Sequence, residues 1–266
     1  SVINNSELTS LPEAPAGAVF SAEEQEKYRK FKEERRGAAD YMNLEGEFSK
    51  YLEDVYSAPP VERESLMDEC EIVVVGAGFA GLLLWYKLQH AGFKDVRFCE
   101  KGGDVGGTWY WNRYPGARCD SESQGYAYFF SRELHRNWQW TERYPSHTEI
   151  RTYLNYVADS LNLKKDIIFE TQVSSCRFFE GSNVWQVCVE DGRVFHSKWL
   201  ISAVGCLSAA NLPKIPGLHL FKGEWYHTGK WPHDDVDFSG LRVGQIGTGS
   251  TGIQVASELA KSCKHF

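Results

Sequence analysis

The sequence predicts an α/β protein with two Rossmann-like dinucleotide-binding domains, a small β-meander and a helical N-terminal extension. Two glycine-rich turns, GAGFAG at 76–81 and GTGSTG at 247–252, carry this prediction. An apolar run precedes each turn and a helical pattern follows it, as in the βα unit that holds a dinucleotide. We expect an extension at 1–65, a first nucleotide-binding domain at 66–210, and the start of a second, incomplete one at 211–266.

The composition allows a large core and excludes several classes of protein. Of the 266 residues, 42% are hydrophobic, and the net charge of −7 argues against nucleic acid as a partner. No stretch approaches the roughly 18 apolar residues of a membrane span, and residues 1–20 lack the pattern of a signal peptide. The seven cysteines have no metal-binding spacing, so we expect reduced thiols, no metal site and a cytoplasmic protein.

Helix and strand patterns follow one another along most of the chain. Ser21 and Glu24 form a capping box that opens a helix to residue 36, whose charges favour a solvated face over a docking site. Ser146 and Glu149 form a second capping box, which opens a helix to about residue 161. The other expected helices are 41–56, 79–91 and 250–261, and the expected strands are 71–75, 96–100, 167–169, 173–179, 184–190, 194–204 and 241–246.

Each glycine of the first turn has its own purpose in binding a dinucleotide. Gly76 allows the tight turn, Gly78 lets a pyrophosphate approach the backbone, and Gly81 lets the helix pack on the strand. The N-terminus of the helix that begins near Phe79 offers N–H donors to phosphate oxygens. Glu100 ends the next strand 19 residues after Gly81, where a carboxylate can accept hydrogen bonds from ribose hydroxyls. A purely structural turn is the less favoured alternative.

The second turn has the same context, so we expect it to bind a second dinucleotide. The sequence ends at Phe266, where the next strand is expected. A Rossmann half needs at least a βαβ unit, and we therefore expect this domain to be incomplete.

Two further segments are rich in glycine and aromatic residues. They are GGTWYWNRYPGARCD at 106–120 and FKGEWYHTGKWP at 221–232. The glycines of the first segment favour a close approach to its backbone, and its aromatic rings favour stacking. The alternative is an ordered loop over a domain interface. The first resembles the Baeyer–Villiger monooxygenase pattern Ala/Gly-Gly-x-Trp-x4-Phe/Tyr-Pro-Gly/Met-x3-Asp, and the second resembles that flavoprotein family's Phe-x-Gly-x3-His-x3-Trp-Pro/Asp pattern. Trp231 followed by Pro232 favours this family over the related flavin monooxygenases that oxidise nitrogen or sulfur.

The resemblance implies FAD on the first turn and NADPH on the second. The implied FAD-binding residues are Gly76, Gly78, Phe79, Gly81, Glu100, Thr108, Trp109, Asp120, Tyr126 and Val173. The implied NADPH-binding residues are Arg118, Asp120, Gly247, Thr248, Gly249, Ser250, Thr251 and Gly252. The implied catalytic residues are Asp120, which pairs with an arginine absent from these 266 residues, His227, which couples the domains, and Trp231.

The resemblance also implies an activity for the parent enzyme. It would be an FAD- and NADPH-dependent monooxygenase that uses a C4a-peroxyflavin to insert one oxygen atom of O2 next to a ketone carbonyl, giving an ester or lactone. We expect the 266 residues alone to be inactive, with the missing C-terminal part as a partner. The alternatives are an N- or S-oxygenating flavin monooxygenase, a non-catalytic fragment, and a disulfide reductase, for which Cys99 and Cys119 are too isolated.

Overall fold

The structure is a computed structural model that describes residues 67–210, 213, 215–232 and 235–266, together with Glu26, Lys30, Asp54 and Tyr56. The chain separates into two units, Ser1–Tyr41 and Met42–Phe266. Apart from those four single positions, the helices expected at 21–36 and 41–56 lie outside the described residues. In the first unit, Lys30 Nζ lies 3.9 Å from Glu26 Oε1, one helical turn earlier. The contacts below belong to the second unit.

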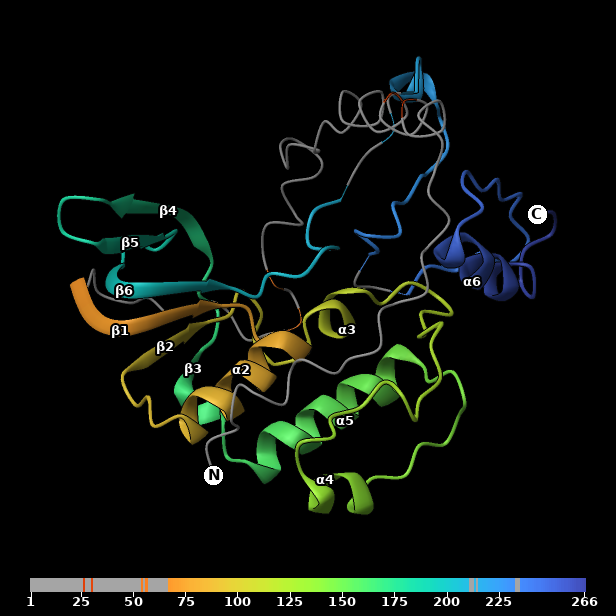
Figure 1. Cartoon of the computed structure of the whole chain (residues 1–266). Coiled ribbons are helices and arrows are strands. Elements are labelled where there is room, and N and C mark those ends of the chain that lie inside the picture. Colours follow the sequence, from red (N-terminus) through yellow and green to blue (C-terminus); the bar gives the residue numbers. More distant parts are fainter. Residues whose placement is uncertain are drawn as a thin grey trace. The chain divides into compact units, whose positions relative to one another are not determined.

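Within the described residues of the second unit, a sheet of six strands runs in the order β3-β2-β1-β6-β5-β4 (Figure 1). The neighbours β3, β2, β1 and β6 are parallel, whereas β6, β5 and β4 are antiparallel. The parallel part is the expected Rossmann-like half, and the antiparallel part is the expected meander, so the predicted α/β class is confirmed. The strands are β1 (Met67–Val75), β2 (Val96–Cys99), β3 (Ile167–Ile168), β4 (Val173–Phe179), β5 (Val184–Val189) and β6 (Val194–Ser202).

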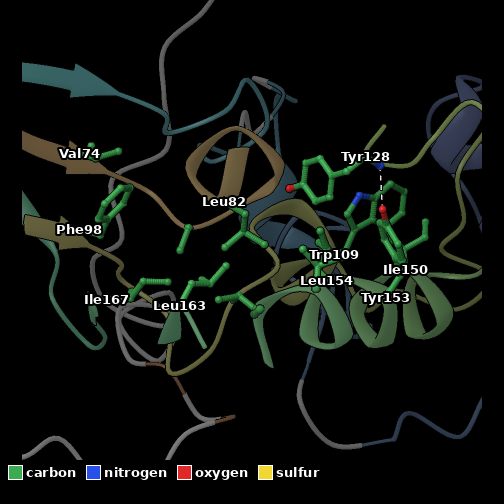
Figure 2. Packing of buried hydrophobic residues seen from close by; sticks show 14 of the residues in the cluster. Val74, Leu82, Phe98, Trp109, Tyr128, Ile150, Tyr153, Leu154, Leu163 and Ile167 are labelled. Carbon is green, nitrogen blue, oxygen red and sulfur yellow. Dashed lines mark hydrogen bonds between the residues drawn. The ribbon is translucent and has the colours of Figure 1, made fainter. Parts of the chain in front are cut away.

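Two helices, α2 (Phe79–His90) and α5 (His147–Ser160), pack with one face of the parallel strands. Val74 of β1, Leu82 of α2 and Leu154 of α5 belong to one buried cluster (Figure 2). Fully burying an apolar side chain of this size contributes roughly 1.5–3 kcal/mol. This cluster therefore holds the end of β1, and with it the first glycine turn, against two helices. The other helices are α3 (Thr108–Trp111), α4 (Arg132–Asn137), α6 (Ser250–Leu259) and the 3₁₀ turns η3 (Lys164–Asp166) and η4 (Leu218–Leu220).

Only one of the two hydrogen bonds of the predicted capping box at the start of α5 is formed. The Ser146 hydroxyl accepts from the Glu149 N–H at 3.3 Å, as a cap requires. The Glu149 carboxylate, however, accepts from the Thr141 N–H at 2.6 Å. The Glu149 carboxylate thus binds a backbone N–H of the preceding loop, and this hydrogen bond attaches the start of α5 to that loop.

Residues 241–246 form no strand in the described part of the chain, so that expectation is wrong. Arg242 makes an isolated parallel bridge with His265, and Ile246 is 80% exposed. A strand needs a neighbouring segment to pair its backbone N–H and C=O groups, and the described residues supply only that bridge. Helix α6 forms nevertheless, because Val255 and Leu259 bury their side chains in a cluster with Phe238.

Candidate functional site

The first glycine turn connects β1 to α2, and its outer glycines are required by packing. Gly76 has a φ of +105°, and a Cβ there would lie 2.6 Å from the Ala203 carbonyl oxygen. A Cβ on Gly81 would lie 2.0 Å from the Gly76 oxygen. Both positions therefore exclude any side chain. Gly76 lets the turn pass close to the backbone just after β6, and Gly81 lets α2 pack on the turn.

The N-terminus of α2 is bare. Its N-cap is Gly78, no side chain caps it, and its first turn carries no acidic residue. A Cβ on Gly78 would lie 3.3 Å from the Gly107 Cα, so a second glycine backbone faces the turn. The Gly106 N–H donates to the Ala77 carbonyl at 3.1 Å and holds the two loops together. Backbone N–H groups and a positive helix end without a side chain are what a pyrophosphate requires, so these residues fit a dinucleotide.

Glu100 lies just after β2 and joins the turn to the next loop. The side chain is only 4% exposed. Its carboxylate accepts from the Ala77 N–H at 2.6 Å and from the Gly102 N–H at 2.7 Å. Burial raises the pKa of Glu100, while these two N–H groups act in the opposite direction by stabilising the charged form. The carboxylate thus orders the backbone on both sides of the place where a ribose is expected.

The aromatic residues of the first motif gather beside this turn. The Trp109 indole N–H donates to the Tyr126 hydroxyl at 3.0 Å. The rings of Phe79 and Tyr126 meet edge to face, with centroids 4.8 Å apart. Thr108 begins α3 directly after Gly107. Figure 2 shows Trp109 in the same packed layer as the α5 side chains, so these predicted residues form one group.

Val173 is placed near this group by the backbone. It begins β4, two residues after Thr171. The Thr171 N–H donates to the Glu100 carbonyl at 2.8 Å. The structure therefore brings the start of β4 next to the strand end that carries Glu100.

The second glycine turn precedes α6, whose N-terminus is also bare. Its N-cap is Gly249, again with no side-chain cap and no acid in the first turn. Gly247 has a φ of +110°, and a Cβ on Gly252 would lie 2.6 Å from the Gly247 oxygen. Thr248 is exposed between these glycines. The two turns therefore share three features: a positive φ at the first glycine, the second glycine as N-cap, and the third glycine packed against the carbonyl oxygen of the first.

The loop at 114–120 lies against α6. The Ser250 hydroxyl donates to the Asp120 carboxylate at 3.4 Å. The Tyr114 hydroxyl donates to the Gln254 side chain at 2.8 Å and lies 3.4 Å from the Thr251 hydroxyl. The structure thus places Asp120, which is expected to contact both cofactors, at the start of α6. The exposed Arg118 side chain forms an ion pair with Glu142 at 3.2 Å.

His227 and Trp231 lie in a separate part of the second unit. The His227 ring accepts from the Gly229 N–H at 3.1 Å within a tight turn, which the Lys230 N–H closes on the His227 carbonyl. Trp231 packs with Tyr226, at a centroid distance of 5.7 Å, in the cluster under α6. Trp231 thus contacts the cluster that supports α6, whereas the hydrogen bonds of His227 lie within its own turn.

Sequence reasoning missed two residues at these sites, Asp54 and Gln254. The Asp54 carboxylate accepts from the Gly103 N–H at 2.7 Å and from the Tyr110 hydroxyl at 2.6 Å. Gln254 bonds to the backbone of Arg118, 136 residues earlier. Gln254 lies one helical turn after Ser250, so its spacing on the expected helix indicated that both side chains share one face. No pattern in the sequence pointed to Asp54.

A search of the described residues finds no helix long and apolar enough to cross a membrane. In the same part of the chain, no group of three or more His, Cys, Asp or Glu side chains is placed to hold a metal ion.

Comparisons with known proteins agree with this geometry. The family model described as flavin-binding monooxygenase-like matches residues 69–266. Acetone monooxygenase (methyl acetate-forming) of Gordonia sp. (strain TY-5) is 46% identical over 71% of this chain and 36% of its own length. Phenazine N-monooxygenase PhzNO1 of Lysobacter antibioticus is 43% identical over 74% of this chain and 36% of its own length.

A solved structure of similar fold is an oxidised steroid monooxygenase bound to NADP. It is 47% identical, with a TM-score of 0.68, over 74% of this chain and 37% of that one. The chain thus spans little more than a third of the length of the relatives it matches.

Proposed function

This chain belongs to the flavin-binding monooxygenase-like family, and on that premise we propose that the protein is an FAD- and NADPH-dependent Baeyer–Villiger monooxygenase. Its substrates would be a ketone and O2, and its product an ester or lactone. Nucleic acid has no place in this function, and we propose that the enzyme works in the cytoplasm. A further C-terminal part would complete the active site.

The observation that supports this proposal most is the bare N-terminus of α2 facing a second glycine backbone. Any side chain at Gly78 would project toward Gly107, into the space a pyrophosphate needs. The N–H groups at this helix end would bind the FAD phosphates, and Glu100 would orient the ribose. Bound FAD would supply the redox chemistry, namely hydride transfer and the activation of O2.

The remaining residues would position and shield the reaction. Trp109, Tyr126 and Phe79 form a ring cluster that would keep water from the flavin end of the site. The second bare helix end, at α6, would bind the NADPH phosphates. Asp120, which is hydrogen-bonded to Ser250 at the start of α6, would lie between the two nucleotide sites and contact both cofactors. Trp231, which packs in the cluster with Val255 and Leu259 of α6, would support that second site, and His227 would couple the two domains.

A second candidate is oxygenation of a nitrogen or sulfur atom. It is favoured by the relative named phenazine N-monooxygenase, which is nearly as similar to this chain as the acetone enzyme. The carbonyl chemistry is preferred because Trp231 and Pro232 complete the second motif. A non-catalytic nucleotide-binding protein is the third candidate.

The experiment has two stages. The purified complete enzyme should be yellow with a flavin absorption spectrum, and anaerobic NADPH should bleach it; a colourless complete enzyme that takes up no FAD would reject the proposal. Product analysis of the complete enzyme with a cyclic ketone, an amine and a sulfide then separates the candidates. Lactone formation supports the proposal, whereas an N-oxide or sulfoxide as the sole product overturns it.

A further inference from the structure

We propose that Asp54, which precedes the nucleotide-binding fold, is a positioning residue for FAD. It acts through Tyr110 and the loop that follows Glu100. This inference rests on the proposed function, because it assigns FAD to the first glycine turn. It adds a part of the N-terminal extension to a site that the family motifs place entirely after residue 66.

Two neighbouring N–H groups of the loop after β2 go to two different carboxylates. Gly102 donates to Glu100 at 2.7 Å, within the fold, and Gly103 donates to Asp54 at 2.7 Å, from 49 residues upstream. Hydrogen bonds to ionised acceptors are roughly twice as strong as neutral ones. The loop is therefore held by two carboxylates. Glu100 belongs to the fold itself, and Asp54 belongs to the N-terminal extension.

The same Asp54 oxygen also accepts from the Tyr110 hydroxyl, at 2.6 Å. Tyr110 is only 4% exposed, and burial, followed by this hydrogen bond, raises the pKa of its hydroxyl well above the usual range. Tyr110 thus remains a neutral donor at all working pH values. Its position along the α3 axis is set by a carboxylate outside the Rossmann-like half.

Tyr110 in turn occupies the space that two glycines leave open. A Cβ on Gly102 would lie 2.9 Å from the Tyr110 ring, and a Cβ on Gly106 would lie 3.0 Å from the Tyr110 Cβ. Gly106 directly precedes Gly107, the residue that faces Gly78 across the pyrophosphate site. A shift of Tyr110 would therefore move the backbone of Gly106 and Gly107, which borders the proposed pyrophosphate site.

Tyr56 strengthens the same attachment. Its N–H donates to the other Asp54 carboxylate oxygen at 3.0 Å, which fixes the orientation of that carboxylate. The Arg113 guanidinium carbon lies 3.1 Å from the centroid of the Tyr56 ring, and Arg113 Nε donates to the Tyr110 carbonyl at 2.8 Å. The extension thus contacts Tyr110 within α3 through a hydrogen bond and Arg113, just after α3, through a cation–π contact.

The test uses Asp54→Asn and Tyr110→Phe in the complete protein, with the FAD dissociation constant measured by flavin fluorescence. The amide that replaces the Asp54 carboxylate is nearly isosteric but neutral, so the FAD dissociation constant should rise roughly tenfold. Tyr110→Phe removes one of the two bonds and should have a smaller effect. The double variant should be no worse than Asp54→Asn, because both changes break the same link.

Asp237→Asn is the matched control. Asp237 also accepts from the N–H two residues ahead, Ser239, at 2.9 Å, but this exposed turn lies beyond the second motif, away from the first glycine turn. FAD binding of that variant should equal that of the wild type. Hydrogen–deuterium exchange supplies a readout independent of FAD, since amides 102–107 should exchange faster in Asp54→Asn without ligand.

The outcomes separate the two proposals. If the wild-type protein binds no FAD, the proposed function fails and this inference fails with it. If the wild type binds FAD, but Asp54→Asn binds it equally well and protects amides 102–107 equally, only the role of Asp54 is overturned. Weaker FAD binding with loss of protection at 102–107, at unchanged protection of α5, supports the role of Asp54.

Discussion

Gln254 of α6 binds both backbone polar groups of Arg118. Its side-chain nitrogen donates to the Arg118 carbonyl at 3.0 Å, and its side-chain oxygen accepts from the Arg118 N–H at 3.4 Å. A Cβ on Gly116 would lie 2.6 Å from the Gln254 carbonyl oxygen, so the loop approaches the helix backbone closely. The second nucleotide helix is thus attached to the loop that continues the first motif.

Gln254→Ala should loosen this attachment. It removes the acceptor of the Tyr114 hydroxyl as well as the two bonds to Arg118, and at about 0.5 kcal/mol for each of these three largely exposed hydrogen bonds the loss is about 1–2 kcal/mol. Hydrogen–deuterium exchange should show faster exchange of amides 116–119. Ser257→Ala, which removes an exposed hydroxyl from the same helix, is the control. Unchanged protection of 116–119 in Gln254→Ala would contradict the attachment.

Gly78→Ala should abolish FAD retention without unfolding the protein. The new methyl group would lie 3.3 Å from the Gly107 Cα, so that the facing backbone must shift slightly, and it would occupy the proposed pyrophosphate position. The measurement is the flavin content after gel filtration, with circular dichroism to verify folding. Gly181→Ala is the control, because a Cβ there meets nothing within 4 Å. A Gly78→Ala protein with full flavin content would show that the first site is misassigned.

Trp231→Ala should leave FAD bound but impair flavin reduction by NADPH. Trp231 packs with Tyr226 and with Phe238, whose ring centroid is 6.1 Å away, under α6. Its removal should destabilise α6 by about 2 kcal/mol, less than the roughly 3–5 kcal/mol of a fully buried Trp. Stopped-flow reduction and amide exchange of α6 measure the two effects. Trp199→Ala, at a 55% exposed position, should change neither, and equal reduction rates in both variants would argue against this role.

Cys70 and Cys99 should resist alkylation in the folded protein. Burial raises the pKa of Cys70 to about 11 and that of Cys99 to about 12, from an ordinary value of 9.0. At about pH 8 both remain thiols, and only thiolates react. The exposed Cys206 should therefore be labelled first by iodoacetamide, as peptide mass mapping can determine. Labelling of Cys99 as fast as Cys206 would contradict its burial.

The same two pKa values predict how stability depends on pH. The unfolded chain releases these protons near pH 9, whereas the folded chain holds them to about pH 11 for Cys70 and about pH 12 for Cys99. The folded state binds more protons in that window, so these two thiols should leave the free energy of unfolding constant with pH below about 9 and should lower it as the pH rises above about 9. Cys70→Ala should weaken this decline in denaturant titrations between about pH 8 and 10. An equal slope in the variant would exclude Cys70 as a source.

The sequence predicted the local elements well where short-range chemistry decides them. The β1 run, the first glycine turn and α2 follow from β-branched residues, from a φ that only glycine adopts readily and from close helix packing. The failure at 241–246 has the opposite cause. Those residues have the composition of a strand, but a strand exists only when a neighbour pairs with it.

The sequence by itself determined that two helix ends without a covering side chain occur in this chain, because glycine at 76, 78 and 81, and at 247, 249 and 252, permits the tight turn and places no Cβ at the helix start. Only the tertiary structure decided what surrounds them: the carboxylate of Asp54 on the loop after Glu100, and the amide of Gln254 on Arg118. Such contacts join positions 49 and 136 residues apart. They depend on how the chain closes and what it buries, which no periodicity along the sequence records.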